Sequence, residues 1–160
     1  MGYKRILVPV SFAPSCKKAI RMAAGMAVAY GSRLLVLNVY KKLPRMFYSA
    51  GGALYSKDIE RQREDAIKEL ERFVHHELYG TGIKLNVEEM EVLEDDPVTG
   101  ILGVAKEKDV DLIILGHHEE SRLEHILFGR NIDRIIKRAP CDVIVTRTPL
   151  EDIDVIVPAA

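Results

Sequence analysis

The chain has 160 residues, of which 48 % are hydrophobic and 29 % charged, with a formal net charge of -1 at pH 7. These values are typical of one globular domain with a core of its own. The near-neutral charge argues against broad attraction to nucleic acid or anionic membranes. No apolar run approaches the roughly 18 residues that a membrane span needs.

The beginning of the chain and its cysteines indicate a reducing compartment. Residues 1–5 lead straight into a short apolar run, without the hydrophobic region or cleavage site of a signal peptide. Cys16 and Cys141 lie far apart in the sequence, and no C-x-x-C pair occurs. We therefore expect reduced thiols in a cytoplasmic protein rather than a disulfide or a redox pair.

The first part of the chain predicts a strand, a helix and a second strand. Residues 6–10 are apolar without alternation, as in a strand that is covered on both faces. A helix should follow, because Pro14 suits a first helical turn and Gly31 suits a helix end. Residues 33–39 predict the second buried strand. Residues 41–57 have no period and predict a long loop, which is either a binding loop or a disordered insertion.

The middle of the chain continues to alternate between helix and strand. Apolar residues at helical spacing predict a long helix over residues 58–78. Residues 83–93 predict a third strand, whose slipped alternation and acidic residues suit the edge of a sheet. Asp96 is the expected N-cap of the next helix, and Pro97 is its expected first residue.

Residues 111–145 form the last unit, in which an apolar strand stops at Gly116 and a helix is expected from about Asn131. Gly116 should form a turn, Gly129 should precede the helix, and residues 143–145 predict the fifth strand. A glycine turn before a helix N-terminus is a common phosphate-binding arrangement, because free backbone N–H groups and the helix dipole favour anions. Whether this unit still binds phosphate is therefore the central question about its function.

Strands that alternate with helices predict an α/β fold with a doubly wound, five-stranded parallel sheet of order 3-2-1-4-5 and helices on both faces. Ligands bind such sheets beyond the carboxyl ends of strands one and four, where the strand order reverses. Residues 10–12 and 115–117 are expected there. No metal site is expected, because the histidines lack zinc-binding spacing, and no P-loop or G-x-S-x-G enzyme motif occurs.

The chain resembles the universal stress protein family over roughly residues 4–146. The blocks that carry the resemblance are residues 6–10, 92–97, 111–116, 127–129 and 139–145. The resemblance implies the adenine nucleotide alpha hydrolase-like form of the fold, with one domain over residues 1–147 and a tail over residues 148–160. It also implies a homodimer through the last strand, from Asp142 to Thr146. Residues 155–157 of the tail either add an edge strand or contact a partner.

One branch of this family binds ATP through a G-x2-G-x9-G-[ST] motif and an acidic residue after the first strand. Gly116 and Gly129 match the first and third glycines. Glu119 replaces the second glycine, Arg130 the serine or threonine, and Ser11 the acidic residue. The remaining site residues that the resemblance implies are the hydrophobic adenine contacts Pro9, Val39 and Leu115, together with Val10 and Asn131.

These exchanges should weaken phosphate binding. Glu119 adds a negative charge, and like charges about 4 Å apart cost roughly 1 kcal/mol in water and about 4 kcal/mol at an effective dielectric constant of 20. A helix N-terminus stabilises a bound anion by only about 0.3–1 kcal/mol. Arg130 and Asn131 offset part of this cost, since arginine binds phosphate well. We therefore expect tight ATP binding to be weakened or lost.

Two functions fit this pattern. The first is a non-catalytic regulatory or protective protein of the universal stress type, whose degenerate nucleotide pocket acts through the dimer and the 41–57 loop. The second is a stress sensor that binds ATP or AMP, or a slow ATPase with magnesium, in which Arg130 replaces the lost hydroxyl. A redox protein that uses Cys16 and Cys141 would be a third class and would show a thiol-dependent mobility shift, which we do not expect.

Overall fold

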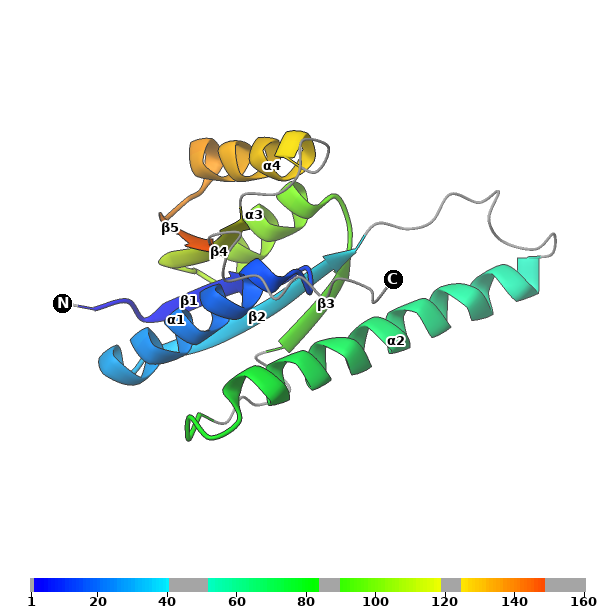
Figure 1. The fold of residues 1–160 in the computed structure, drawn as a ribbon. Helices are drawn as coiled ribbons and strands as arrows, with labels where there is room; N and C mark the ends of the chain where they lie inside the picture. Colours follow the sequence, from blue (N-terminus) through cyan, green and yellow to red (C-terminus); the bar gives the residue numbers. More distant parts are fainter. Residues whose placement is uncertain (1, 41–51, 84–89, 119–124, 149–160) are drawn as a thin grey trace, which may run out of the picture.

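The computed structural model describes residues 2–40, 52–83, 90–118 and 125–148. Helices and strands alternate along the chain (Figure 1). They are β1 (Arg5–Pro9), α1 (Pro14–Tyr30), β2 (Arg33–Tyr40), α2 (Gly52–Leu78), β3 (Met90–Glu94), α3 (Pro97–Glu107), β4 (Leu112–His118), α4 (His125–Arg138) and β5 (Asp142–Thr148). The five strands form one parallel sheet of order β3-β2-β1-β4-β5, which confirms the predicted fold class and strand order.

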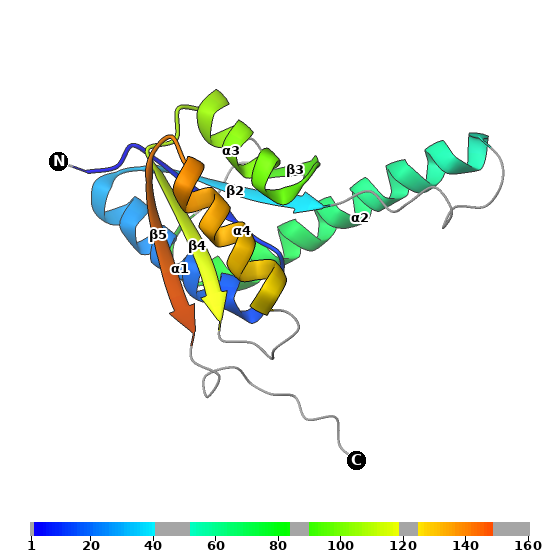
Figure 2. The same cartoon turned by 90° about the horizontal axis from the view of Figure 1, so that it is seen from above.

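The sheet is buried on both faces. Helices α1 and α2 cover one face, and α3 and α4 cover the other (Figures 1 and 2). Successive side chains of a strand point to opposite faces, so Ile6 and Val8 pack under α1 and α2 while Leu7 packs under α3 and α4. All three side chains are fully buried, which explains why β1 is apolar without alternation.

The predicted start and end of α1 and the predicted start of α3 are confirmed. Pro14 opens α1, and the helix ends at Gly31, whose φ of 68° is left-handed and suits a residue without a side chain. Asp96 caps α3, because its carboxylate accepts a hydrogen bond from the Thr99 N–H at 3.2 Å, and Pro97 follows as the first helical residue. These signals depend on local geometry, so the sequence predicts them well.

The second helix is longer than predicted. Helix α2 begins at Gly52, so the prediction that residues 52–57 belong to a loop was wrong, whereas residues 41–51 lie outside the described part. Once a helix has nucleated, each added residue gains a hydrogen bond, and residues without an apolar stripe can therefore extend it. The first turns of α2 extend well beyond the sheet (Figures 1 and 2).

Strand β4 extends beyond its predicted end. Strand β4 continues through Gly116 to His118, so Gly116 lies inside the strand and does not form the predicted turn. The reason is that β5 runs to Thr148, and the ladder between these strands continues to their last residues. Strand β3 is described over Met90–Glu94, and Ile83 lies outside it, just after a turn at Gly82, whose φ is 78°. Residues 84–89 of the predicted third strand lie outside the described part.

The last helix begins earlier than predicted. Helix α4 starts at His125 rather than at about Asn131. Gly129 and Arg130 therefore lie within the helix, and the prediction that Gly129 precedes it was wrong. The apolar positions of the second half of α4 already identified the helix, but the sequence contained no N-cap that would locate its start.

Candidate functional site

A cavity of about 170 Å³ lies at the carboxyl ends of β1 and β4, where the strand order reverses. Its lining includes seven residues predicted for the site, namely Pro9, Val10, Ser11, Val39, Leu115, Gly116 and Asn131. Glu119 lies outside the described residues, and the side chains of residues 129 and 130 are not described. The cavity is smaller than the roughly 300–1,000 Å³ of typical small-molecule sites.

Five further residues line the cavity and were not predicted. Pro97 and Ile101 come from the first turns of α3, Ile132 and Ile135 come from α4, and Cys16 comes from α1. The spacings of the two helical pairs place each pair on one helix face, so the sequence indicated that they are inward-facing. Only the packing of α3 and α4 on the same sheet face brings both pairs to this end of the sheet.

The cavity has apolar walls and no charged group in its described lining. Its polar lining residues are Ser11, Cys16 and Asn131. The described walls therefore suit a flat, largely apolar ring better than a phosphate group, because an unpaired anion in such surroundings loses its hydration without a charged partner.

Gly116 lets α1 approach β4 closely. A Cβ atom at this position would lie 2.4 Å from the Ser15 carbonyl oxygen and 3.0 Å from the Cys16 nitrogen. Such distances are far below van der Waals contact, so no other residue fits without moving the backbone of α1. The missing side chain thus has a packing role in this chain, independent of any phosphate.

Ser11, which stands at the acidic position of the ATP-binding branch, contacts the first turn of α1. Its backbone N–H donates to the Cys16 sulfur at 3.3 Å, and its hydroxyl oxygen lies 3.6 Å from the same atom. Cys16 is only 4 % exposed. Ser11 is therefore oriented by a weak acceptor within the cavity wall, and its side chain supplies a hydroxyl where the motif supplies a carboxylate.

The turn after β1 is strained. Phe12 has a φ of 64°, a left-handed conformation that costs a non-glycine residue roughly 1–2 kcal/mol. Its ring packs edge-on against Phe73 of α2, with centroids 5.8 Å apart and planes at 76°. The buried Asn38 amide also donates to the Val10 carbonyl at 2.9 Å. These contacts hold the turn that presents Ser11.

We expect Phe12→Gly to be about 1 kcal/mol more stable than Phe12→Ala, although both lose the ring contact with Phe73. Alanine keeps the strain of the left-handed conformation, whereas glycine adopts it freely. Ala29→Gly, on the exposed side of α1, is the control and should destabilise the protein by about 1 kcal/mol. Urea denaturation measures all three variants, and an alanine variant as stable as the glycine variant would contradict the strain.

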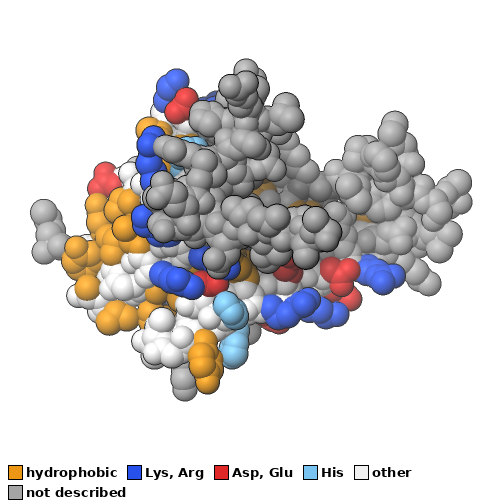
Figure 3. Space-filling model, in the orientation of Figure 1, with side chains coloured by type: hydrophobic (Ala, Val, Ile, Leu, Met, Phe, Trp, Pro, Cys, Tyr) orange, Lys and Arg blue, Asp and Glu red, His pale blue; other side chains and the backbone are white. Residues whose placement is uncertain are grey.

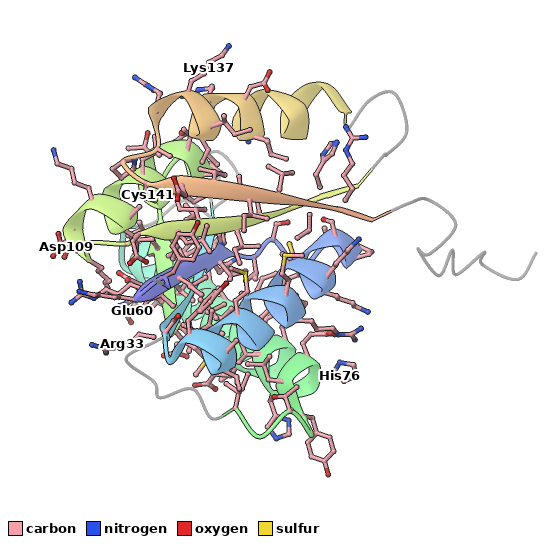
Figure 4. The ribbon with its side chains drawn as sticks, turned by 90° about the vertical axis from the view of Figure 1, so that its left-hand side faces the viewer. Arg33, Glu60, His76, Asp109, Lys137 and Cys141 are labelled. Atoms are coloured by element: carbon pink, nitrogen blue, oxygen red, sulfur yellow. The ribbon has the colours of Figure 1, made fainter. Side chains whose placement is uncertain are left out.

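The start of α4 changes the predicted phosphate contacts. In a helix that begins at His125, only the N–H groups of the first turn are free, and those of Gly129 and Arg130 join the helical hydrogen bonds. In this conformation, the two positions offer no free backbone donors. Figure 4 shows that Lys137, farther along α4, points away from the body of the protein, as expected for a solvated basic face.

The two cysteines are free and lie in different surroundings. Cys141 lies just before β5, where it is partly buried (Figure 4). Burial is the main cause that raises the pKa of its thiol, and the negative charge of Asp142 is the second. Among the described residues, no group of three or more His, Cys, Asp or Glu side chains could hold a metal ion. In the same part of the chain, no helix has the length and hydropathy needed to cross a membrane.

Comparisons with known proteins agree on one family. The model of the universal stress protein family matches residues 2–147. A universal stress protein from Methanocaldococcus jannaschii is 27 % identical over 152 residues, which cover 94 % of this chain and 85 % of the relative.

Solved structures of such proteins share the fold. A universal stress protein in complex with cAMP superposes with a TM-score of 0.65 at 17 % identity, covering 92 % of this chain and 99 % of the other. A universal stress protein family protein from Arabidopsis thaliana with AMP bound gives a TM-score of 0.60 at 17 % identity, covering 93 % and 94 %. At these sequence identities, the comparison shows that the proteins share a fold.

Proposed function

The chain belongs to the universal stress protein family, and from this premise we propose that it is a non-catalytic regulatory or protective protein whose pocket has lost tight ATP binding. Its fold is adenine nucleotide alpha hydrolase-like, and its family supports a stress-related function. The proposal concerns the ligand and the way in which the protein acts. It rests on the cavity at the ends of β1 and β4.

The main support is a cavity whose described lining is uncharged and suits the base of an adenine nucleotide. Pro9, Val39 and Leu115 supply apolar contacts from three neighbouring strands. The family members solved with cAMP and with AMP contain adenine nucleotides that carry a single phosphate. We propose that the cavity holds the adenine ring and that the ligand, if it is a nucleotide, is a monophosphate rather than ATP.

The phosphate-binding side supports weak ATP binding. Glu119 introduces a negative charge where the ATP-binding motif has glycine. Ser11 provides a hydroxyl in place of a carboxylate, and the N–H groups of Gly129 and Arg130 lie inside α4. Arg130 and Asn131 provide the compensating donors. We propose that these donors do not restore the lost contacts, because a triphosphate carries more charge than they neutralise.

Calorimetric titration tests the proposal directly. Mg-ATP is expected to bind with a Kd weaker than about 10 μM, which corresponds to roughly -7 kcal/mol. AMP is expected to bind more tightly than Mg-ATP, and GMP is the control for the base. Nucleotide released from the purified protein by heat reports a ligand that is already bound. A Kd for Mg-ATP below about 10 μM would show that the phosphate side is intact.

A second candidate function is an ATP- or AMP-binding sensor, or a slow ATPase with magnesium. The nucleotides in the two solved family members favour it. In this case Arg130 would contribute to phosphate binding and its replacement would weaken binding. Release of inorganic phosphate from Mg-ATP separates the ATPase from both non-catalytic proposals.

We also propose that the protein forms a homodimer through β5, from Asp142 to Thr146, and that residues 1–147 act as one domain. Strand β5 is an edge of the sheet and, among the described residues, pairs with β4 alone. Residues 143–145 are only partly buried although all three are apolar, as expected of a strand whose outer side is covered by a partner. The two free thiols fit a reducing compartment such as the cytoplasm.

A further inference from the structure

Asn38 places a buried amide within the apolar run of β2. The residue is only 5 % exposed, and its neighbours in the strand, Leu37 and Val39, are both apolar. Figure 3 shows, by contrast, Lys, Arg, Asp and Glu side chains on the surface along α2. A buried amide costs free energy unless it is hydrogen-bonded, so the partner of Asn38 indicates what this residue does.

The partner of the amide is the carbonyl group that follows β1. The Asn38 Nδ2 atom donates to the Val10 oxygen at 2.9 Å. The Val10 N–H donates to the Leu37 carbonyl at 2.8 Å, and among the described residues this is the last backbone bond between β1 and β2. The side chain of Asn38 therefore binds the first main-chain acceptor beyond the end of the ladder.

A regular parallel ladder would continue with a different bond. In such a ladder, a residue donates to one residue of the neighbouring strand and accepts from the residue two positions later. Because Val10 donates to Leu37, its oxygen would next accept from the Val39 N–H. The structure has no such bond between these two residues, and β1 ends at Pro9. Asn38 thus occupies the acceptor that the backbone of Val39 would otherwise use.

The backbone of Val39 consequently faces the nucleotide cavity. Backbone groups alternate in direction along a strand, so those of Val39 point to the same side as those of Leu37, toward β1. Those of Tyr40 point toward β3, where the Tyr40 carbonyl accepts from the Asp95 N–H at 3.1 Å. Beyond the end of β1, the side that Val39 faces is the cavity, and Val39 belongs to its lining. The Val39 N–H is therefore a donor at the cavity wall.

We propose that Asn38 is a positioning residue, which binds the Val10 carbonyl and so keeps the Val39 N–H free to donate to the ligand in the cavity. This inference rests on the proposed nucleotide function. The ring nitrogens of a purine base are suitable acceptors for such a donor. Without the amide of Asn38, the ladder between β1 and β2 would extend by one bond, and the cavity would lose this donor.

Scalar couplings across hydrogen bonds, measured by NMR on the full-length chain, test the ladder without a ligand. In the wild-type protein, no coupling is expected between the Val39 amide nitrogen and the Val10 carbonyl carbon. In Asn38→Leu, which keeps the size of the side chain but not its donor, this coupling should appear. Asn38→Val, with a smaller side chain, has the same expected result. A coupling already present in the wild-type protein, or absent from the folded variants, would overturn the proposal.

Calorimetry with AMP tests the consequence for the cavity. Asn38→Leu should bind AMP about tenfold more weakly than the wild-type protein, as expected when one buried hydrogen bond is lost. Asn38→His should keep the wild-type affinity, because the histidine Nδ1 atom is attached to Cγ like the amide nitrogen and can donate in its place. A groove of about 560 Å³ beside Asn38 provides room for the larger ring. AMP binding by Asn38→His as weak as that of Asn38→Leu would contradict a role of the donor.

Ser32→Ala is the matched control. The Ser32 hydroxyl donates to the Tyr3 carbonyl, which is the same kind of bond at the opposite end of β1 and β2. Its loss should leave AMP binding unchanged. An equal loss of affinity in this control, or unchanged AMP binding by Asn38→Leu, would refute the role of Asn38. Failure of the wild-type protein to bind AMP would instead refute the proposed nucleotide function, and the couplings decide the role of Asn38 in the ladder in either case.

Discussion

Gly116→Ala is expected to destabilise the protein by about 3 kcal/mol or more. The new Cβ atom would lie 2.4 Å from the Ser15 carbonyl oxygen and 2.7 Å from its carbonyl carbon. These are backbone atoms of the first turn of α1, so a change of side-chain rotamer cannot relieve the clash. The whole of α1 would have to move away from β4, and the wall formed by Cys16 would move with it. Urea denaturation measures the loss.

Gly25→Ala is the matched control for this variant. Gly25 also lies in α1. Apart from the nearby backbone of α1 itself, an added Cβ atom there would have no heavy atom within 4 Å. The exchange should stabilise the protein by about 0.5–1 kcal/mol, because alanine has less conformational entropy to lose in a helix. If Gly116→Ala lost less than about 1 kcal/mol, the close approach of α1 and β4 would not require glycine.

Glu119→Gly combined with Arg130→Ser is expected to tighten Mg-ATP binding at least about tenfold. Removing a carboxylate near a phosphate relieves a repulsion of about 1–4 kcal/mol, depending on the local dielectric constant. The change also restores two of the three positions at which this chain departs from the ATP-binding branch, leaving Ser11 unchanged. If Arg130 instead binds phosphate, the double variant should bind equally well or more weakly. Calorimetry with Mg-ATP distinguishes these results.

The control for this experiment makes the same two exchanges elsewhere. Glu107→Gly with Arg138→Ser changes the last residues of α3 and α4, which are exposed and absent from the lining of the cavity. This variant has the same net charge as the test variant, so it should leave the affinity for Mg-ATP unchanged. An equal gain in both variants would indicate an effect of local helix stability rather than of the site.

The sequence predicted most of the described cavity and its apolar contacts, but not where the neighbouring helix begins. Pro9, Val39 and Leu115 were expected to meet because parallel strands place their carboxyl ends at one edge. The prediction failed where the start of α4 decided the result. Gly129 was expected to offer a free N–H group, yet it lies in the second turn of that helix. Helix starts without a recognisable cap depend on tertiary contacts, which the local sequence does not encode.

By itself, the sequence determined the alternation of elements and the apolar strands, because these depend on periodicity and on the burial of parallel strands. The strand order followed from the doubly wound pattern to which such an alternation belongs. Only the tertiary structure decided that Gly116 serves the contact with Ser15, since that contact joins residues about a hundred positions apart. It also decided that Phe12 packs on Phe73. Such contacts arise when helices pack on a finished sheet, and the spacing within one segment cannot specify them.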